Sequence, residues 1–180
     1  VKEFNEDHFV VMATEKGMVK KTKLSAYSNP RKKGIYAVEI REGDRLIEAR
    51  VSTGDNDILL GTRNGKSIRF SEEQIRASGR KTMGVKGITL SSEDDKLVGM
   101  LLIKRDGTVL VATEKGFGKR TEISQYRAQK RGGKGVLTMK TTDKVGKMVT
   151  IKEVVEKDDL MIITNQGVLI RLPVSQIRSI

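Results

Sequence analysis

The sequence contains no cysteine and no tryptophan, and its 180 residues include a single histidine, His8, and only two prolines. Without cysteine the chain can form neither a disulfide nor a cysteine-rich zinc site. One histidine provides no cluster with metal-ligand spacing, and it has no serine, cysteine or acidic partner at the spacing of a nucleophilic triad. We therefore expect no catalytic residue, no metal site and no cofactor in this chain.

Long apolar runs are also missing. Apolar runs such as those at 109–112 and 160–163 have the length of strands, whereas a membrane-spanning helix needs about 18 apolar residues or more. No basic amphipathic helix is apparent, and the N-terminus lacks the charged-then-apolar order of a signal peptide. These absences favour a cytoplasmic protein that does not bind a membrane.

Charge of one sign is abundant. Lysine and arginine number 35 against 23 aspartate and glutamate, so the formal net charge is +12 and the pI is near 9.9. Such an excess predicts a polyanionic partner. Aromatic residues make up only 4%, which argues against single strands bound by base stacking. Because no recognition helix or zinc finger is visible either, we expect duplex DNA bound with little sequence preference.

An internal repeat is the strongest pattern in the sequence. Each of four segments has an apolar run, then Thr-x-x-Gly, then a basic run, and the glycines lie 48, 51 and 51 residues apart. A period of this size indicates a propeller or a solenoid. The anchoring glycines are Gly17, Gly65, Gly116 and Gly167. We place the repeats at 4–54, 55–105, 106–157 and 158–180, the last one incomplete, within one domain covering 1–180.

The residues around each glycine predict β-structure. Thr-x-x-Gly predicts a hairpin whose glycine has positive φ, and Asn64–Gly65 fits a type I′ turn. The apolar run before each turn, such as 58–60, predicts a central strand buried on both faces. Strands at 35–40 and 45–52 would bring the first repeat to about four strands, as in a propeller blade. We therefore predict an all-β, propeller-like fold with about three and a half four-stranded blades. Closure needs about four to eight blades, so a fragment is expected.

A basic loop follows the hairpin in each of the first three repeats, at 28–34, 77–84 and 128–135. Blades arranged around an axis would place these loops on one rim, where a belt of cations could hold a bent duplex. The candidate DNA-binding cations of the loops are Arg31, Lys32, Lys33, Arg80, Lys81, Lys130, Arg131 and Lys134. The hairpin cations expected to extend the belt are Lys20, Lys21, Arg69, Lys119 and Arg120.

The heptad QKRGGKG at 129–135 resembles the box motif of the DNA gyrase A C-terminal domain family, written QRRGGKG, and differs from it only at Lys130. The segments MATEKGMVKKT, GKSIRF and GFGKRTEISQY also resemble this family, so the resemblance covers essentially the whole chain. It implies a β-pinwheel, a six-bladed disc whose blades exchange strands and whose rim wraps DNA with positive handedness. Box residues added to the candidate DNA-binding site are Gln129, Gly132, Gly133 and Gly135.

The resemblance also implies partners. The parent would be an ATP-dependent type II topoisomerase that introduces negative supercoils, with ATP and Mg used outside this chain. Its partners would be double-stranded DNA and, in an A2B2 holoenzyme at the nucleoid of a bacterial cytoplasm, the remaining gyrase A subunit with the gyrase B subunit. The family's defining box lies in the first blade, whereas this box is in the third repeat. We interpret 1–180 as internal blades, roughly the third to the start of the sixth.

Two alternatives stay open. One is the related topoisomerase IV domain, whose boxes are usually degenerate, and the other is a propeller-like module that binds acidic proteins. Tyrosine-based transesterification is not expected, because Tyr27 and Tyr126 share a repeat position with Ile75 and Ile177, which indicates core packing. The acidic run at 93–95 is interpreted as turn chemistry and not as a magnesium site.

Overall fold

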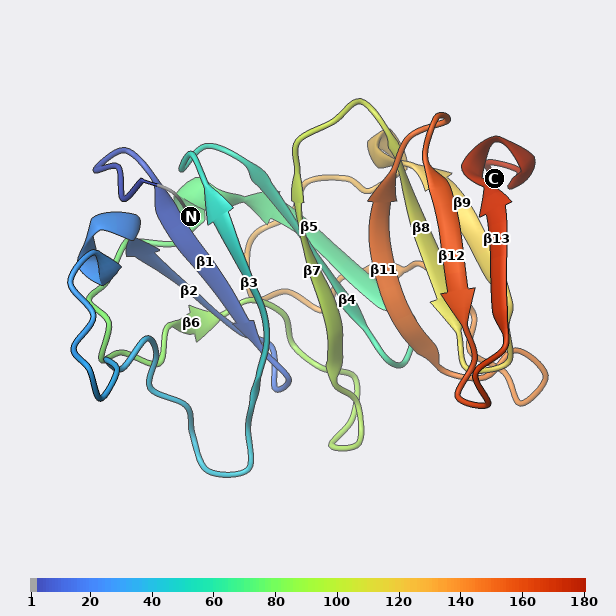
Figure 1. Cartoon of the computed structure of the whole chain (residues 1–180). Helices are drawn as coiled ribbons and strands as arrows, with labels where there is room; N and C mark the ends of the chain where they lie inside the picture. Colours follow the sequence, from blue (N-terminus) through green and yellow to red (C-terminus); the bar gives the residue numbers. More distant parts are fainter. Residues whose placement is uncertain (1–2) are drawn as a thin grey trace.

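The structure is a computed structural model that describes residues 3–180. Four antiparallel sheets stand side by side along a curve (Figure 1). The first sheet, in the order β3-β1-β2-β6, contains β1 (Phe9–Thr14), β2 (Met18–Lys23), β3 (Leu46–Ser52) and β6 (Val85–Lys86). The second, β10-β5-β4-β7, contains β4 (Asp57–Thr62), β5 (Lys66–Ser71), β7 (Leu97–Ile103) and β10 (Val136–Leu137).

The remaining two sheets have fewer strands. The third, in the order β11-β8-β9, contains β8 (Thr108–Thr113), β9 (Gly118–Glu122) and β11 (Met148–Val154). The fourth pairs β12 (Asp159–Ile163) with β13 (Leu169–Pro173). A short 3-10 helix ends each hairpin: η1 (Leu24–Tyr27), η2 (Glu72–Gln74), η3 (Ile123–Gln125) and η4 (Val174–Gln176). The predicted all-β, propeller-like class is confirmed.

The four Thr-x-x-Gly hairpins close in the same way. In each, the glycine N–H donates to the threonine carbonyl at 3.0 Å, and the glycine φ lies between 79° and 83°. The type I′ turn predicted at Asn64–Gly65 is wrong, because no described residue other than glycine has positive φ. The loop has one residue more than a two-residue turn, so only its glycine adopts the left-handed conformation.

The strands β1, β4 and β8, which precede the first three turns, are central and mostly buried as predicted, whereas β12 of the fourth repeat is mostly exposed. β4 lies between β5 and β7. Its Ile58 and Leu60 pack in a cluster with Val11 of the first sheet, while Leu59 packs in a cluster with Val109 of the third. The core therefore consists of the layers between neighbouring sheets, and each sheet depends on the next for the burial of its apolar faces.

The outermost strand of each complete sheet is contributed by the following repeat. β6, from the second repeat, pairs with β2, and β10, from the third, pairs with β5. The strand predicted at 45–52 is confirmed as β3, but the strand predicted at 35–40 is wrong. No strand of the described chain runs alongside that segment, and an isolated strand has no partners for its backbone groups.

Strand exchange requires close backbone approach at Gly84. A Cβ built on Gly84 would lie 2.3 Å from the Val19 carbonyl oxygen, whereas a Cβ on Gly34 would meet nothing within 4 Å, although both residues have φ of 81°. Gly84→Ala is therefore expected to destabilise the chain by about 1–3 kcal/mol more than Gly34→Ala. Urea unfolding of both variants measures the difference. Equal losses would mean that φ alone matters and that the approach of β6 to β2 is not tight.

Ion pairs between residues at the hairpin turns also join neighbouring sheets. Glu15 of the first repeat pairs with Lys96 of the second at 2.9 Å, and Arg63 of the second pairs with Glu114 of the third at 2.8 Å. Hydrogen bonds from Lys96 and then Arg45 lower the pKa of Glu15 below its ordinary 4.5. The hydrogen bond from Arg63 is the main cause of the lowered pKa of Glu114.

These lowered pKa values predict a loss of stability in acid. A carboxyl whose pKa is lower in the folded state stabilises the fold above its unfolded pKa, and this stability is lost as the pH falls through the folded pKa. The melting temperature should decline below about pH 4.5. In a Glu15→Gln, Glu114→Gln double variant it should be lower near neutral pH and fall less steeply in acid. Thermal melts from about pH 3 to 7 test this, with Glu93→Gln as an exposed control that should follow the parent curve.

The structure agrees with two interpretations from the sequence, namely packing of the tyrosine and isoleucine repeat position and turn chemistry for the acidic run at 93–95. Tyr126 and Ile75 are buried, while Tyr27 is half-buried with its hydroxyl donating to the Ala37 carbonyl at 3.0 Å. Asp95 accepts hydrogen bonds from the Ser91 hydroxyl at 2.7 Å and from the Asn64 N–H at 2.9 Å, which is turn chemistry. Within residues 3–180 no group of acidic, histidine or cysteine side chains is arranged to hold a metal. No helix of this part of the chain could span a membrane.

Candidate nucleic-acid interface

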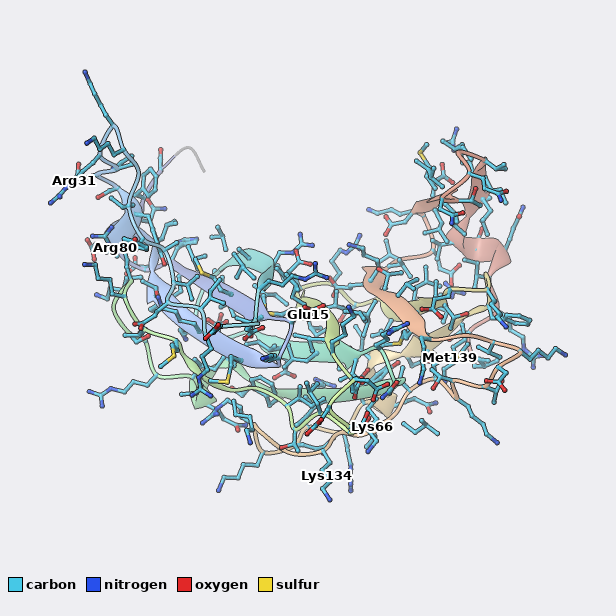
Figure 2. The ribbon with its side chains drawn as sticks, turned by 90° about the horizontal axis from the view of Figure 1, so that it is seen from below. Glu15, Arg31, Lys66, Arg80, Lys134 and Met139 are labelled. Carbon is cyan, nitrogen blue, oxygen red and sulfur yellow. The ribbon has the colours of Figure 1, made fainter. Side chains whose placement is uncertain are left out.

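Two of the three basic loops lie on the outer side of the curve, and the first lies at one end of it (Figure 2). Each follows a 3-10 helix and then leads toward the position of the outermost strand, which is formed in the second and third repeats as β6 and β10. Seen from below, the sheets follow an arc, and Arg80 and Lys134 lie on its convex side, with Arg31 at one end (Figure 2). The loops contain no acidic residue, and their eight cations account for two thirds of the net charge of +12.

Most of the loop cations are free. None of the eight forms an ion pair with an acidic residue among residues 3–180. Arg80 and Arg131 are half-buried. The six exposed loop cations are Arg31, Lys32, Lys33, Lys81, Lys130 and Lys134. We call these six residues the rim cations. A row of exposed, unpaired cations along a convex edge can contact successive phosphates of a bent duplex.

The box loop, residues 129–135, is anchored to the second repeat. The Gln129 N–H donates to the Arg69 carbonyl, and the Gly132 N–H donates to the Gly87 carbonyl, both at 2.8 Å. A Cβ on Gly135 would lie 2.5 Å from the Ser67 carbonyl oxygen. These backbone groups of the box are therefore used in packing against the neighbouring sheet, and the exposed charged groups of the loop are the ammonium groups of its two lysines.

The Arg131 guanidinium also points into the protein. It donates from Nε to the Gln74 carbonyl at 3.2 Å and from one terminal nitrogen to the Lys86 carbonyl. Arg131 is half-buried, in contrast to Lys130 and Lys134. The three cations of the box look alike in the sequence, but only its two lysines are exposed in the structure.

The hairpin cations of the first repeat do not extend the exposed belt. Lys20 is 2% exposed, and its ammonium donates to the Ala37 carbonyl at 2.9 Å and to the Arg80 carbonyl. Burial, followed by the nearby Arg80 charge, lowers the pKa of Lys20. Lys21 is 6% exposed and pairs with the buried Glu72 at 3.1 Å. The Lys20 ammonium is thus enclosed by the segments around Ala37 and Arg80, and the Lys21 ammonium also donates to the Gly54 carbonyl at 2.9 Å.

The equivalent arginines also bind protein groups. Arg69 pairs with Asp57 and donates to the Ile123 carbonyl of the third repeat at 3.1 Å. Arg120 is 5% exposed and pairs with Glu156 at 2.6 Å. Lys119 alone among the five hairpin candidates is half-buried without an ion pair to a described acid. The repeated cation four residues after each glycine therefore joins structural elements together.

Gln74 and three further cations, Lys66, Lys86 and Lys140, were not among the predicted site residues. The Gln74 amide holds two backbone groups of the box loop. Lys86 and Lys140 are exposed and follow the second and third loops in the sequence, and Lys66 lies opposite Leu137 of β10 in the strand register. A signal for Gln74 existed, since glutamine recurs at its repeat position in Gln125 and Gln176.

Known proteins resemble the chain along nearly all of its length. Residues 8–53, 56–104, 107–154 and 158–180 match the family described as DNA gyrase C-terminal domain, beta-propeller. The A subunit of DNA gyrase from Staphylococcus aureus (strain MRSA252) is 46% identical over 175 residues, which are 96% of this chain and 20% of that protein. The chain thus spans about a fifth of the length of the curated relatives it matches.

Two solved structures have the same fold. The C-terminal domain of a DNA topoisomerase IV has a TM-score of 0.93 and 25% identity, and the match covers 99% of this chain and 56% of that one. A DNA gyrase A C-terminal domain has a TM-score of 0.84 and 24% identity, covering 95% of this chain and 57% of that one. With the repeat, the exchanged strands and the matched residues in agreement, the chain belongs to the family of DNA gyrase C-terminal β-propeller domains.

Proposed function

We propose that this chain binds double-stranded DNA without sequence preference and wraps it around its convex basic edge. The observation that carries the proposal is the set of six rim cations, exposed and unpaired with described acids, in loops that repeat along the curve. Cations elsewhere are frequently paired, as Lys96 is with Glu15 and Arg63 with Glu114. Family membership supports the same conclusion.

Binding along a convex edge implies bending. Phosphate contacts spread over three successive sheets can be made together only if the duplex follows the curve, and the cost of bending is offset by the added contacts. Sequence-independent binding follows because the described residues include no α-helix that could enter the major groove. Rim lysines contact phosphates and not base edges.

In the parent protein, this wrapping would present DNA to a gyrase-type topoisomerase. The remainder of the gyrase A subunit, together with the gyrase B subunit, would complete an A2B2 holoenzyme, and ATP with Mg would drive negative supercoiling outside this chain. The intact box favours gyrase over a topoisomerase IV-type domain, whose fold is equally compatible with the structure. A module that binds acidic proteins is the other alternative.

A salt titration tests duplex binding. If the six rim cations each neutralise one phosphate, the logarithm of affinity should fall with the logarithm of salt concentration with a slope of about −5. A random-sequence duplex and a second duplex of different composition should give the same curve. A flat salt dependence would contradict the proposal, and equal binding to poly-glutamate would favour the acidic-protein alternative.

Chiral wrapping needs a separate measurement. Relaxed, nicked circular DNA is sealed by ligase with the chain bound, and the linking number is compared with that of DNA sealed alone. Positive wrapping predicts a positive shift that grows with the amount of bound chain. Binding without any shift would leave DNA association intact but would contradict chiral wrapping.

A further inference from the structure

The box loop is held on its neighbour by two side chains. The Gln74 Oε1 accepts the Arg131 N–H at 2.7 Å, and its Nε2 donates to the Gln129 carbonyl at 3.3 Å. In return the Arg131 guanidinium donates to the carbonyls of Gln74 and Lys86. The two residues, from different repeats, therefore bind each other's backbone.

Further hydrogen bonds continue this contact along the loop. The Thr89 hydroxyl donates to the Gly132 carbonyl at 2.7 Å, and the Thr89 N–H donates to the Gly133 carbonyl at 2.9 Å. The loop is thus fixed at positions 129, 131, 132 and 133, and the lysines at 130 and 134 lie between or beside fixed residues. Holding the backbone on both sides of Lys130 limits the directions in which its ammonium can point.

The chain contains an internal comparison for this arrangement. Arg80 occupies in the second loop the repeat position that Arg131 occupies in the third. The residue of the preceding repeat equivalent to Gln74 is Ala26, which has no amide. Correspondingly, the Arg80 side chain makes no hydrogen bond to any residue of the described chain, and this loop is held instead by the Lys20 ammonium on the Arg80 carbonyl. Of the two equivalent arginines, only Arg131, whose loop also meets a glutamine, donates side-chain hydrogen bonds to the preceding repeat.

We propose that Arg131 and Gln74 are positioning residues, which orient the box loop so that Lys130 and Lys134 face the phosphates, and that Arg131 itself contacts no phosphate. This inference rests on the proposed function for its DNA-binding part. It predicts that a neutral residue on a different repeat, Gln74, affects wrapping as strongly as a charged residue of the box.

The test compares four variants of the chain: Gln74→Ala, Arg131→Ala, Lys134→Ala, and Gln125→Ala as a matched control. Gln125 has the same repeat position in η3 but forms no hydrogen bond with its side chain to the described residues. Without DNA, hydrogen exchange at the 129–133 amides should accelerate about tenfold in Gln74→Ala and Arg131→Ala, and remain unchanged in the other two.

With DNA, the salt slope and the linking-number shift at saturating protein separate positioning from contact. Lys134→Ala should reduce the slope by about 0.9. Gln74→Ala and Arg131→Ala release the same loop and its two lysines, so these two variants should match each other both in any change of slope and in their reduced linking-number shift. In a fifth variant that combines Gln74→Ala with Arg131→Ala, the linking-number shift should fall no further than in either single variant, because both residues serve one contact.

Two results would overturn the inference. A slope reduced by about 0.9 in Arg131→Ala but not in Gln74→Ala would show direct phosphate contact by the arginine. Unchanged loop exchange in Gln74→Ala would show that the glutamine does not hold the loop. Failure of the unsubstituted chain to bind DNA would instead contradict the proposed function, and the exchange measurement would still decide whether the two residues position the loop.

Discussion

Replacement of five rim lysines by alanine is expected to lower duplex affinity about a thousandfold at about 0.15 M salt. Each lysine that neutralises one phosphate contributes about 0.9 to the salt slope, so the slope should fall by about 4 to 5. Because these side chains are exposed and unpaired, the melting temperature should change little. The variant replaces Lys32, Lys33, Lys81, Lys130 and Lys134. Fluorescence anisotropy with a labelled duplex at several salt concentrations measures both quantities.

A second variant controls for total charge. It removes five exposed lysines that lie at hairpin turns, in other turns or on the innermost strand β11: Lys16, Lys104, Lys115, Lys152 and Lys157. Both variants lose the same formal charge, but the control keeps the rim cations, so its salt slope should stay within about 1 of the parent. Equal losses in the two variants would show that DNA responds to net charge and would contradict a defined belt.

Glu72→Ala should destabilise the chain more than any change to the rim. Glu72 is fully buried, and its Oε1 lies 3.1 Å from the Lys21 ammonium as an ion pair, without accepting a hydrogen bond. Its other oxygen accepts from the Ser52 hydroxyl and from the Asn56 amide at 3.3 Å. The substitution leaves the buried Lys21 ammonium without its counterion, which costs about 3–5 kcal/mol. Urea unfolding measures the loss.

Two further variants show whether the ion pair itself is responsible. Glu73→Ala, which removes an exposed carboxylate from the next position in η2, should cost about 0.5 kcal/mol or less. Replacing both partners, as in Lys21→Met with Glu72→Leu, should recover most of the stability, because a buried ion pair can be exchanged for apolar side chains at little cost. A double variant as unstable as Glu72→Ala would mean that the hydrogen bonds to Ser52 and Asn56 dominate.

Much of the fold was predictable because it depends on local patterns. The Thr-x-x-Gly spacing located every hairpin, and the continuous apolar runs identified β1, β4 and β8 as central strands, although β12 of the fourth repeat lies in a sheet of only two strands. The error at 35–40 has a physical reason. The equivalent strands in the second and third repeats, β6 and β10, contain only two residues each, and each pairs with a strand of the preceding sheet. The residues of a single repeat therefore do not indicate whether such a strand has a partner.

The candidate site was predictable only in part. The repeat predicted that all the basic positions would lie in equivalent places on the rim, but it did not predict which of these side chains would be exposed. Lys21, Arg69 and Arg120 recur at one repeat position because each binds protein groups there. Arg131 was grouped with Lys130 and Lys134 because they share a motif, and its inward contacts depend on Gln74, which is 57 residues earlier in the sequence.

The sequence by itself determined the repeat, its β-hairpins, its buried central strands and the excess of positive charge on three equivalent loops. These properties follow from residue type and spacing, which act locally. Only the tertiary structure decided which strand completes each sheet and which cations are free to meet a polyanion. Those outcomes depend on contacts between residues about one repeat apart, such as β6 on β2 and Glu72 beside Lys21, because a side chain is covered or exposed by whatever the neighbouring sheet places against it.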